Sequence, residues 1–282
     1  MQEPEKVEPD QHWTHIDVYR NVKEALYALP AYFRTETEIS GIRATDIFTL
    51  NAALSATIEE QVVNTLNSMR PIWDPEDKYK LYSFVRQPQT FPDVLLKRYS
   101  GSGSDEIVMG IELKGWYLLA KEGEPSFRFT VTPNACAYQD LIVVVPWALS
   151  NVISGVPKIF LPFVENARYV AEYRNYHWQH IRKTRLKTKI ISPSDARPYP
   201  NKSDHIADRP VSDSGGNFGR LARTGIMDAY LESTKSQELC GIRAKYWLAF
   251  FKIFQEQRTE EDIQIEIERL ATQIRRDDSL EE

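Results

Sequence analysis

Residues 109–116 read Met-Gly-Ile-Glu-Leu-Lys-Gly-Trp, a run in which charged and apolar side chains alternate. In a β-strand, residues two apart point to the same face. Glu112 and Lys114 therefore project together, while Ile111 and Leu113 face the core. We predict a strand over residues 107–119 that carries a carboxylate and an ammonium group side by side.

A second carboxylate lies upstream of this strand. Pro92 and Asp93 open the apolar run Val94-Leu95-Leu96, which predicts another strand over residues 93–99. Residues 101–105 read Gly-Ser-Gly-Ser-Asp, a turn signal between strands. Two adjacent strands joined by this turn would bring Asp93 beside Glu112.

Two carboxylates and an ammonium group around one site suit phosphodiester hydrolysis. Mg²⁺ is commonly held by one or two carboxylates with waters and a substrate phosphate, and it lowers the pKa of a bound water. A nearby lysine positions that water or stabilises developing phosphate charge. The pattern Glu-x-Lys also arises by chance, and the chain repeats its parts in Glu76-Asp77-Lys78 and in Pro9-Asp10. The alternative is a surface aspartate and an ordinary charged pair on a solvated strand face.

A further carboxylate belongs to a helix predicted over residues 45–69. Thr45 or Asp46 would cap this helix and Pro71 would stop it. Its apolar side chains recur at three- and four-residue steps, at Leu50, Leu54, Ile58, Val62, Leu66 and Met69. Glu59 lies on the apolar side, whereas Glu60 points away. Because burying an unpaired carboxylate is costly, Glu59 needs a metal or a lysine as partner. The alternative is an edge side chain that reaches water.

The rest of the chain alternates helical and strand-like periods. We expect strands over residues 79–85, 127–132 and 141–145, the last apolar on both faces, as in a sheet covered on both sides. Helices are expected over residues 16–29, ended by Pro30, over the first part of 165–189, and over 235–257 and 259–276. Residues 192–219 predict a long loop. The economical fold class is α/β, with a central mixed β-sheet flanked by helices.

Composition limits the classes of protein. The 282 residues carry 35 Lys+Arg and 40 Asp+Glu, a net charge of −5, and 42% are hydrophobic, which excludes a disordered chain. Two cysteines are too few for a disulfide framework. Residues 1–11 read as a loose polar tail without a secretory signal. Prolines and polar residues interrupt the apolar stretch 141–163, which excludes a membrane span. We expect a cytoplasmic protein with no membrane partner.

A helix bearing Glu59, then Pro92-Asp93 at a strand start, then Glu112-x-Lys114 on the next strand resembles the PD-(D/E)XK nuclease superfamily, and type II restriction endonucleases in particular. The resemblance covers about residues 45–145. It implies a restriction-endonuclease-like α/β core, Mg²⁺ held by Asp93 and Glu112, a Lys114 that acts on the attacking water, and Glu59 as an auxiliary acid. We therefore expect one nuclease domain over residues 1–282, with its catalytic core at 45–145.

Residues 168–189 form a basic segment within a DNA-contacting region expected over 165–225. It holds Arg168, Arg174, Arg182, Lys183, Arg185, Lys187 and Lys189 against Glu172 alone, and seven minus one gives a local charge of +6. Concentrated positive charge suits contacts to phosphates. The hypothesis is that double-stranded DNA is contacted by Arg174, His177, Arg182, Lys183 and Arg185. The alternative is a solvated amphipathic helix whose aromatic side chains pack on the core.

A glycine-containing stretch at residues 213–223 offers groups for base recognition. Glycines allow a close backbone approach, and Asn217, Arg220 and Arg223 can make bidentate contacts to base edges. A nucleotide-phosphate cradle or a plain surface loop are the alternatives, although the spacing fits no P-loop.

The C-terminal helices over 235–276 suggest a homodimer. A restriction enzyme that cuts a palindrome requires a two-fold protein. The narrow apolar seam of Ile263, Ile267, Leu270 and Ile274, together with the preceding apolar run 246–251, could form the contact. These helices could equally cover the core of a monomer. The leading hypothesis is thus a Mg²⁺-dependent, sequence-specific double-strand DNA endonuclease. The alternatives are a repair or mobile-element nuclease and a non-catalytic DNA-binding protein.

Overall fold

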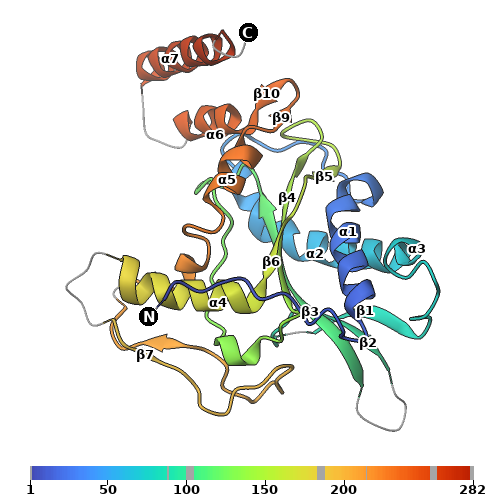
Figure 1. Cartoon of the computed structure of the whole chain (residues 1–282). Coiled ribbons are helices and arrows are strands. Elements are labelled where there is room, and N and C mark those ends of the chain that lie inside the picture. The colour runs from blue at the N-terminus through green and yellow to red at the C-terminus, as the bar shows by residue number, and fades with distance from the viewer. Residues whose placement is uncertain are drawn as a thin grey trace.

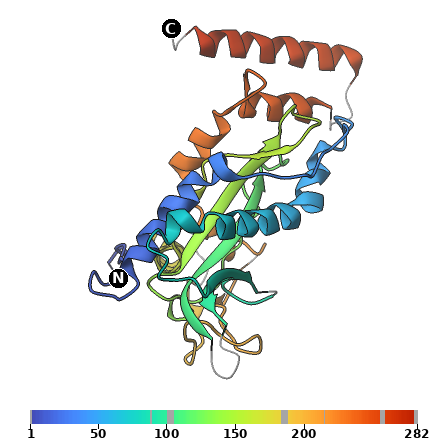
Figure 2. The same ribbon diagram turned by 90° about the vertical axis from the view of Figure 1, so that its right-hand side faces the viewer.

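The computed structural model describes residues 2–87, 89–99, 105–182, 188–213, 215–254 and 259–279. Its centre is a curled sheet covered on both faces by helices. The helices α1 (Ile16–Tyr32) and α2 (Leu50–Ser68) cover one face, and α4 (Ala167–Tyr176) lies on the other (Figures 1 and 2). The short helix α3 (Arg70–Trp73) packs on α1.

The central sheet is mixed. Its strands are β1 (Tyr82–Arg86), β2 (Val94–Arg98), β3 (Glu106–Tyr117), β4 (Leu141–Leu149), β5 (Pro157–Ile159) and β6 (Phe163–Asn166). Their order is β1-β2-β3-β4-β5, and β6 pairs with the first half of β4 while β5 pairs with its end. Only β3 and β4 run parallel among these pairs, and the others are antiparallel. The predicted α/β class with a mixed sheet flanked by helices is confirmed.

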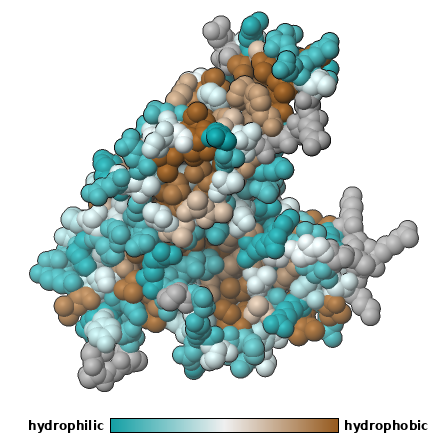
Figure 3. All heavy atoms as spheres, turned by 180° about the vertical axis from the view of Figure 1, so that it is seen from behind, coloured by the Kyte–Doolittle hydropathy of each residue, from teal (hydrophilic) through white to brown (hydrophobic). Residues whose placement is uncertain are grey.

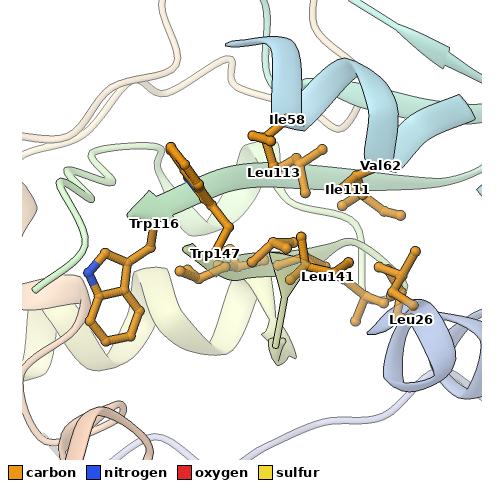
Figure 4. Close-up of a cluster of buried hydrophobic side chains, with 14 of the residues drawn as sticks. Leu26, Ile58, Val62, Ile111, Leu113, Trp116, Leu141 and Trp147 are labelled. Atoms are coloured by element: carbon orange, nitrogen blue, oxygen red, sulfur yellow. The ribbon is translucent and has the colours of Figure 1, made fainter. Parts of the chain in front are cut away.

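The core between the sheet and the first two helices fixes where α2 lies. Ile58 and Val62 of α2 meet Ile111 and Leu113 of β3, and all four are buried (Figure 4). Because one face of α2 is held on β3, Glu59, the neighbour of Ile58, stands beside the middle of that strand.

The crossover from β3 to β4 corrects one prediction. Residues 127–132 form no strand, and only Val131 makes a β-bridge there, to Ala207. The side chain of Arg174 donates to the carbonyl oxygens of Phe129 (2.8 Å) and Val131 (3.0 Å). Two of the carbonyl oxygens that a neighbouring strand would bond thus accept from a buried side chain, and a 3₁₀ turn (η2, Pro133–Ala135) follows.

Helix ends differ from the predicted ones at two prolines. Helix α1 continues through Pro30 to Tyr32, so the predicted end at Leu29 is wrong. Pro71 does not end the long helix either, because α2 stops at Ser68 and Pro71 lies in the first turn of α3. The predicted caps Thr45 and Asp46 precede a 3₁₀ turn (η1, Ile47–Thr49) that leads into α2.

The segment after α4 is mostly irregular, as predicted. A π-helical turn (η3, His177–Ile181) extends α4, and the short strands β7 (Ile190–Ile191) and β8 (Arg209–Pro210) pair with each other. A 3₁₀ turn (η4, Phe218–Ala222) packs near α4. Residues 2–10 have no helix or strand, as expected, yet they are tied down by contacts from Lys6 to Glu165 and from Glu8 to Tyr19.

The predicted helix over residues 235–257 is confirmed only for Ala244–Ile253, because a hairpin interrupts it before that stretch. The chain forms α5 (Asp228–Lys235), a hairpin of β9 (Glu238–Leu239) and β10 (Ile242–Arg243), and then α6 (Ala244–Ile253). Cys240 and Gly241 have φ of 52° and 77°, values that stop a right-handed helix and suit a tight hairpin turn. Helix α7 (Glu260–Asp278) confirms the prediction for 259–276 and starts with a capping box between Thr259 and Asp262. No helix in the described part of the chain is long and apolar enough to cross a membrane.

Candidate active site

The two predicted carboxylates of the strand pair lie together. Val94 of β2 pairs with Ile111 of β3, which places the preceding Asp93 next to Glu112. Asp93 Oδ2 accepts the main-chain N–H of Leu113 at 3.1 Å, and the Glu112 carboxylate accepts the main-chain N–H of Asp93. The Asp93 carboxylate is therefore held by the main chain of β3, and the Glu112 carboxylate by the main chain just before β2.

The approach to Asp93 is fixed by its own loop and by a glycine. The main-chain N–H of Gln87 donates to Asp93 O at 2.6 Å, and its side-chain amide donates to Pro92 O at 3.0 Å. A Cβ on Gly110 would lie 2.1 Å from Pro92 Cγ and 2.9 Å from Asp140 Oδ1. Gly110 is thus the residue that lets Pro92 lie flat on β3 and brings Asp93 to Glu112.

Glu59 joins the site from α2, as predicted, and it meets Lys114. Glu59 Oε1 accepts the main-chain N–H of Gly115 at 3.0 Å and lies 3.8 Å from Lys114 Nζ. Glu59, which was predicted to need a metal or a lysine as partner, is therefore paired with Lys114. Glu60, which was predicted to point away, makes none of these contacts.

These contacts occupy an open edge of the sheet. Strand β2 pairs with β3 only as far as Ile111, so residues 112–117 of β3 pair with β4 on one side alone. Alternate N–H groups at the open side are bonded by side chains: Leu113 by Asp93, Gly115 by Glu59, and Tyr117 by Asn51 Oδ1 at 3.3 Å. Two carboxylates and one amide thus take the place of a neighbouring strand along this edge.

Burial and mutual repulsion make both acids of the pair weaker. Burial raises the pKa of Asp93 to about 6, and the negative charge of Glu59 adds to this while Lys114 opposes it. Burial and then the negative charge of Asp93 raise the pKa of Glu112 to about 8. Two close anions out of bulk water disfavour each other's charged form, so the pair would gain from a cation.

Arg86 is a site residue that sequence reasoning missed. It ends β1 and pairs with Val94, and its Nη2 lies 3.9 Å from Glu59 Oε2. Position 86 gave no motif, and only the register of β1 on β2 brings it to the site. The sequence did contain one usable signal: Arg86 directly follows the strand predicted over residues 79–85, close in sequence to Asp93.

The donor set fits Mg²⁺ through two residues. Asp93 and Glu112 present hard oxygen donors to which no arginine or lysine among the described residues donates, whereas Glu59 is turned toward Gly115, Lys114 and Arg86. Within the described ranges, no group of three or more His, Cys, Asp and Glu side chains is arranged to hold a metal. A pair suffices for Mg²⁺, which takes one or two carboxylates and completes its shell with water and phosphate oxygens.

Arg174 does not contact DNA in this fold, which contradicts its prediction. Its side chain is fully buried and donates to Asp208 Oδ2 at 2.6 Å, to Asn175, and to the crossover carbonyls described above. A guanidinium whose donors are spent inside the protein has none for a phosphate. The aromatic-packing alternative holds for this part of the segment, since Trp178 is buried against Phe218.

The other predicted DNA contacts differ in accessibility. His177 is half-buried, and burial lowers its pKa. Arg182 lies over the Trp178 ring, 3.7 Å from its centroid. Arg223 is drawn into the fold by Glu124 (2.8 Å) and Pro125 O, whereas Asn217 and Arg220 are exposed. Lys183 and Arg185 lie outside the described residues.

The similar motifs elsewhere do not form such a cluster. Glu76 and Lys78 pair with each other as exposed side chains, and Asp10 Oδ1 accepts the main-chain N–H of His12. Comparison with family models, with curated proteins and with solved structures gives no match to this chain. The function must therefore be argued from the site itself.

Proposed function

We propose that this protein is a Mg²⁺-dependent, sequence-specific endonuclease of double-stranded DNA, built on a restriction-endonuclease-like core of the PD-(D/E)XK type. The observation that carries the proposal is the meeting of Asp93, Glu112 and Lys114 with Glu59 at the open edge of β3. Four residues from α2, the loop before β2, and β3 converge there in the order that the resemblance implies.

Each group has a role in phosphodiester hydrolysis. Asp93 and Glu112 would hold Mg²⁺, which supplies Lewis-acid polarisation of the phosphate and a more acidic water. Lys114 orients the attacking water or stabilises charge that develops on the phosphate. Glu59 holds Lys114 over the site at 3.8 Å while its own hydrogen bond to Gly115 fixes it on β3.

We further propose that the protein forms a homodimer through the C-terminal end of the molecule. Helix α7 lies at one end of the molecule beside α6 (Figures 1 and 2), and apolar side chains gather toward that end in Figure 3. The seam of Ile263, Ile267, Leu270 and Ile274 is only half-buried. The acids of α7 fall mainly in its first half, at Glu260, Glu261, Asp262, Glu266 and Glu268, and its arginines follow at Arg269, Arg275 and Arg276.

The test is incubation of plasmid DNA with the purified protein and Mg²⁺. We expect discrete fragments, because a sequence-specific enzyme cuts at fixed positions. Asp93→Ala and Lys114→Ala should each lower the cleavage rate at least about a hundredfold. Single-strand nicks in place of double-strand cuts would favour a repair or mobile-element nuclease. Binding without cleavage at any Mg²⁺ concentration would point to a non-catalytic DNA-binding protein.

A further inference from the structure

Arg86 is placed beside the site by the register of the sheet. It closes β1 opposite Val94, one residue after Asp93. Its side chain reaches toward Glu59 on α2. The guanidinium thus stands at the same opening as Lys114 but comes from a different strand, so the site has two cations on separate supports.

The donors of Arg86 are largely unused. Its distance of 3.9 Å to Glu59 Oε2 is an ion pair without a hydrogen bond, and within the described residues no hydrogen bond of its side chain is found. The side chain is 42% exposed. A guanidinium carries five N–H donors in a planar fork that matches a phosphate. Arg86 can therefore turn from Glu59 to an anion without breaking a hydrogen bond.

Other half-exposed arginines of this sheet region are already engaged. Arg98 on β2 is 45% exposed, yet it lies 2.9 Å from Glu106 Oε2. Arg70 donates to the main-chain oxygens of Tyr79 (2.5 Å) and Tyr82. Arg86 differs from both because it combines unspent donors with a position next to Asp93.

We propose that Arg86 binds a non-bridging oxygen of a backbone phosphate at or next to the scissile bond. Glu59 holds the guanidinium in place until the substrate arrives. The inference rests on the proposed function and adds a second cationic contact to it. Lys114 would then act on the attacking water, and Arg86 would bind the phosphate.

The experiment compares Arg86→Ala and Arg86→Lys with a matched control, Arg98→Ala. Single-turnover cleavage is measured over a range of DNA concentrations, and DNA binding is measured over a range of salt concentrations. We expect Arg86→Ala to raise the half-saturating DNA concentration about 10–100-fold, because a charged hydrogen-bonding pair is lost. The slope of log affinity against log salt should also fall by about 0.9, the value for one phosphate contact.

Arg86→Lys separates charge from shape. It should restore the salt slope, because the positive charge returns, but regain only part of the affinity, because the fork is missing. Arg98→Ala should change neither quantity. A wild-type salt slope in Arg86→Ala, with an unchanged half-saturating concentration, overturns the inference.

Two further outcomes separate this inference from the proposed function. A wild-type protein that binds DNA without cutting it refutes the nuclease proposal, and the salt slopes still decide the role of Arg86. A wild-type protein that neither binds nor cuts DNA refutes both. Thermal unfolding of every variant checks the fold, and Arg86→Lys carries the test if Arg86→Ala unfolds.

Discussion

A single missing methyl group sets the geometry of the proposed site. Gly110 faces Pro92 so closely that any side chain would overlap it. Gly115, on the same strand, has more room, because a Cβ there would meet its nearest neighbour, Ser55 O, at an ordinary 3.5 Å. The two glycines of one strand therefore differ in how much space a side chain would find.

Gly110→Ala should destabilise the protein by about 1–3 kcal/mol, as overpacking does, and lower the cleavage rate because Asp93 moves from Glu112. Gly115→Ala is the control and should leave the free energy of unfolding close to that of the wild type. Urea unfolding measures both variants. Equal stability of Gly110→Ala and Gly115→Ala would contradict this, because it would show that the loop before β2 can move away from β3 without a loss of unfolding free energy.

The raised pKa values of the acid pair predict how stability depends on pH without metal. The folded protein holds protons on Asp93 up to about pH 6 and on Glu112 up to about pH 8, whereas an unfolded chain releases them near pH 4. The folded state thus binds more protons in this window, so stability falls as pH rises from about 4 to 8. Above pH 8 both acids are charged in the folded protein, and the free-energy cost of burying the two charges is complete.

Glu112→Gln should therefore raise the melting temperature of the metal-free protein at pH 9, with a gain that fades toward pH 4. Each kcal/mol recovered corresponds to about 2–4 °C for a chain of this size class. Mg²⁺ should raise the melting temperature of the wild type at pH 9 but not that of Glu112→Gln. Glu106→Gln, on the same strand but 44% exposed, is the control. A melting temperature of Glu112→Gln that is equal to the wild type at pH 9 would contradict the repulsion.

At the scale of elements, the Arg174 side chain holds α4 against the segment that connects β3 to β4. It takes the carbonyl oxygens that would otherwise require another strand, and Asp208 balances its charge. Arg174→Met leaves Asp208 buried without its cation and should cost about 3–5 kcal/mol of unfolding free energy.

Arg168→Met, on the same helix and half-buried against Glu172, is the control and should change stability by less than about 0.5 kcal/mol. Denaturant unfolding measures both variants. Similar losses for the two would mean that the Arg174 network contributes little. If the dependence of DNA affinity on salt concentration weakens in Arg174→Met but not in Arg168→Met, Arg174 does contact DNA, as the sequence predicted.

The elements that were predictable are those in which local pattern and tertiary contacts agree. The alternation around Glu112 and the apolar run of β4 each predict both a strand and the face of it that is buried. Asp93 and Glu112 lie on segments that are adjacent in sequence and pair as neighbours, so their proximity could also be predicted. Residues 127–132 alternate as well, but their bonding partners are the Arg174 side chain and main-chain groups of residues 206–208 and 219, all more than forty residues away. Arg86 was missed for the same reason: its role depends on the strand pairing and not on its neighbours in sequence.

At the scale of the whole molecule, α7 predicts the assembly. If two copies pair through its half-buried seam, Ile267→Asp should convert a particle of two chains into one of a single chain, because a charge cannot enter an apolar contact cheaply. Light scattering measures the mass with and without DNA. Gln273→Asp, on an exposed position of the same helix, should keep two chains. A single-chain mass for the wild type in both conditions would refute the pairing.

The open edge of β3 has a consequence for solubility. Unpaired strand edges recruit strands from other molecules, and proteins usually protect them with charges or coverings. Here Asp93, Glu59 and Asn51 occupy the N–H groups that an incoming strand would bond. Asn51 and two of the groups proposed for catalysis thus also protect the sheet edge from strands of other molecules. Variants that remove all three side chains should therefore aggregate more readily than the wild type.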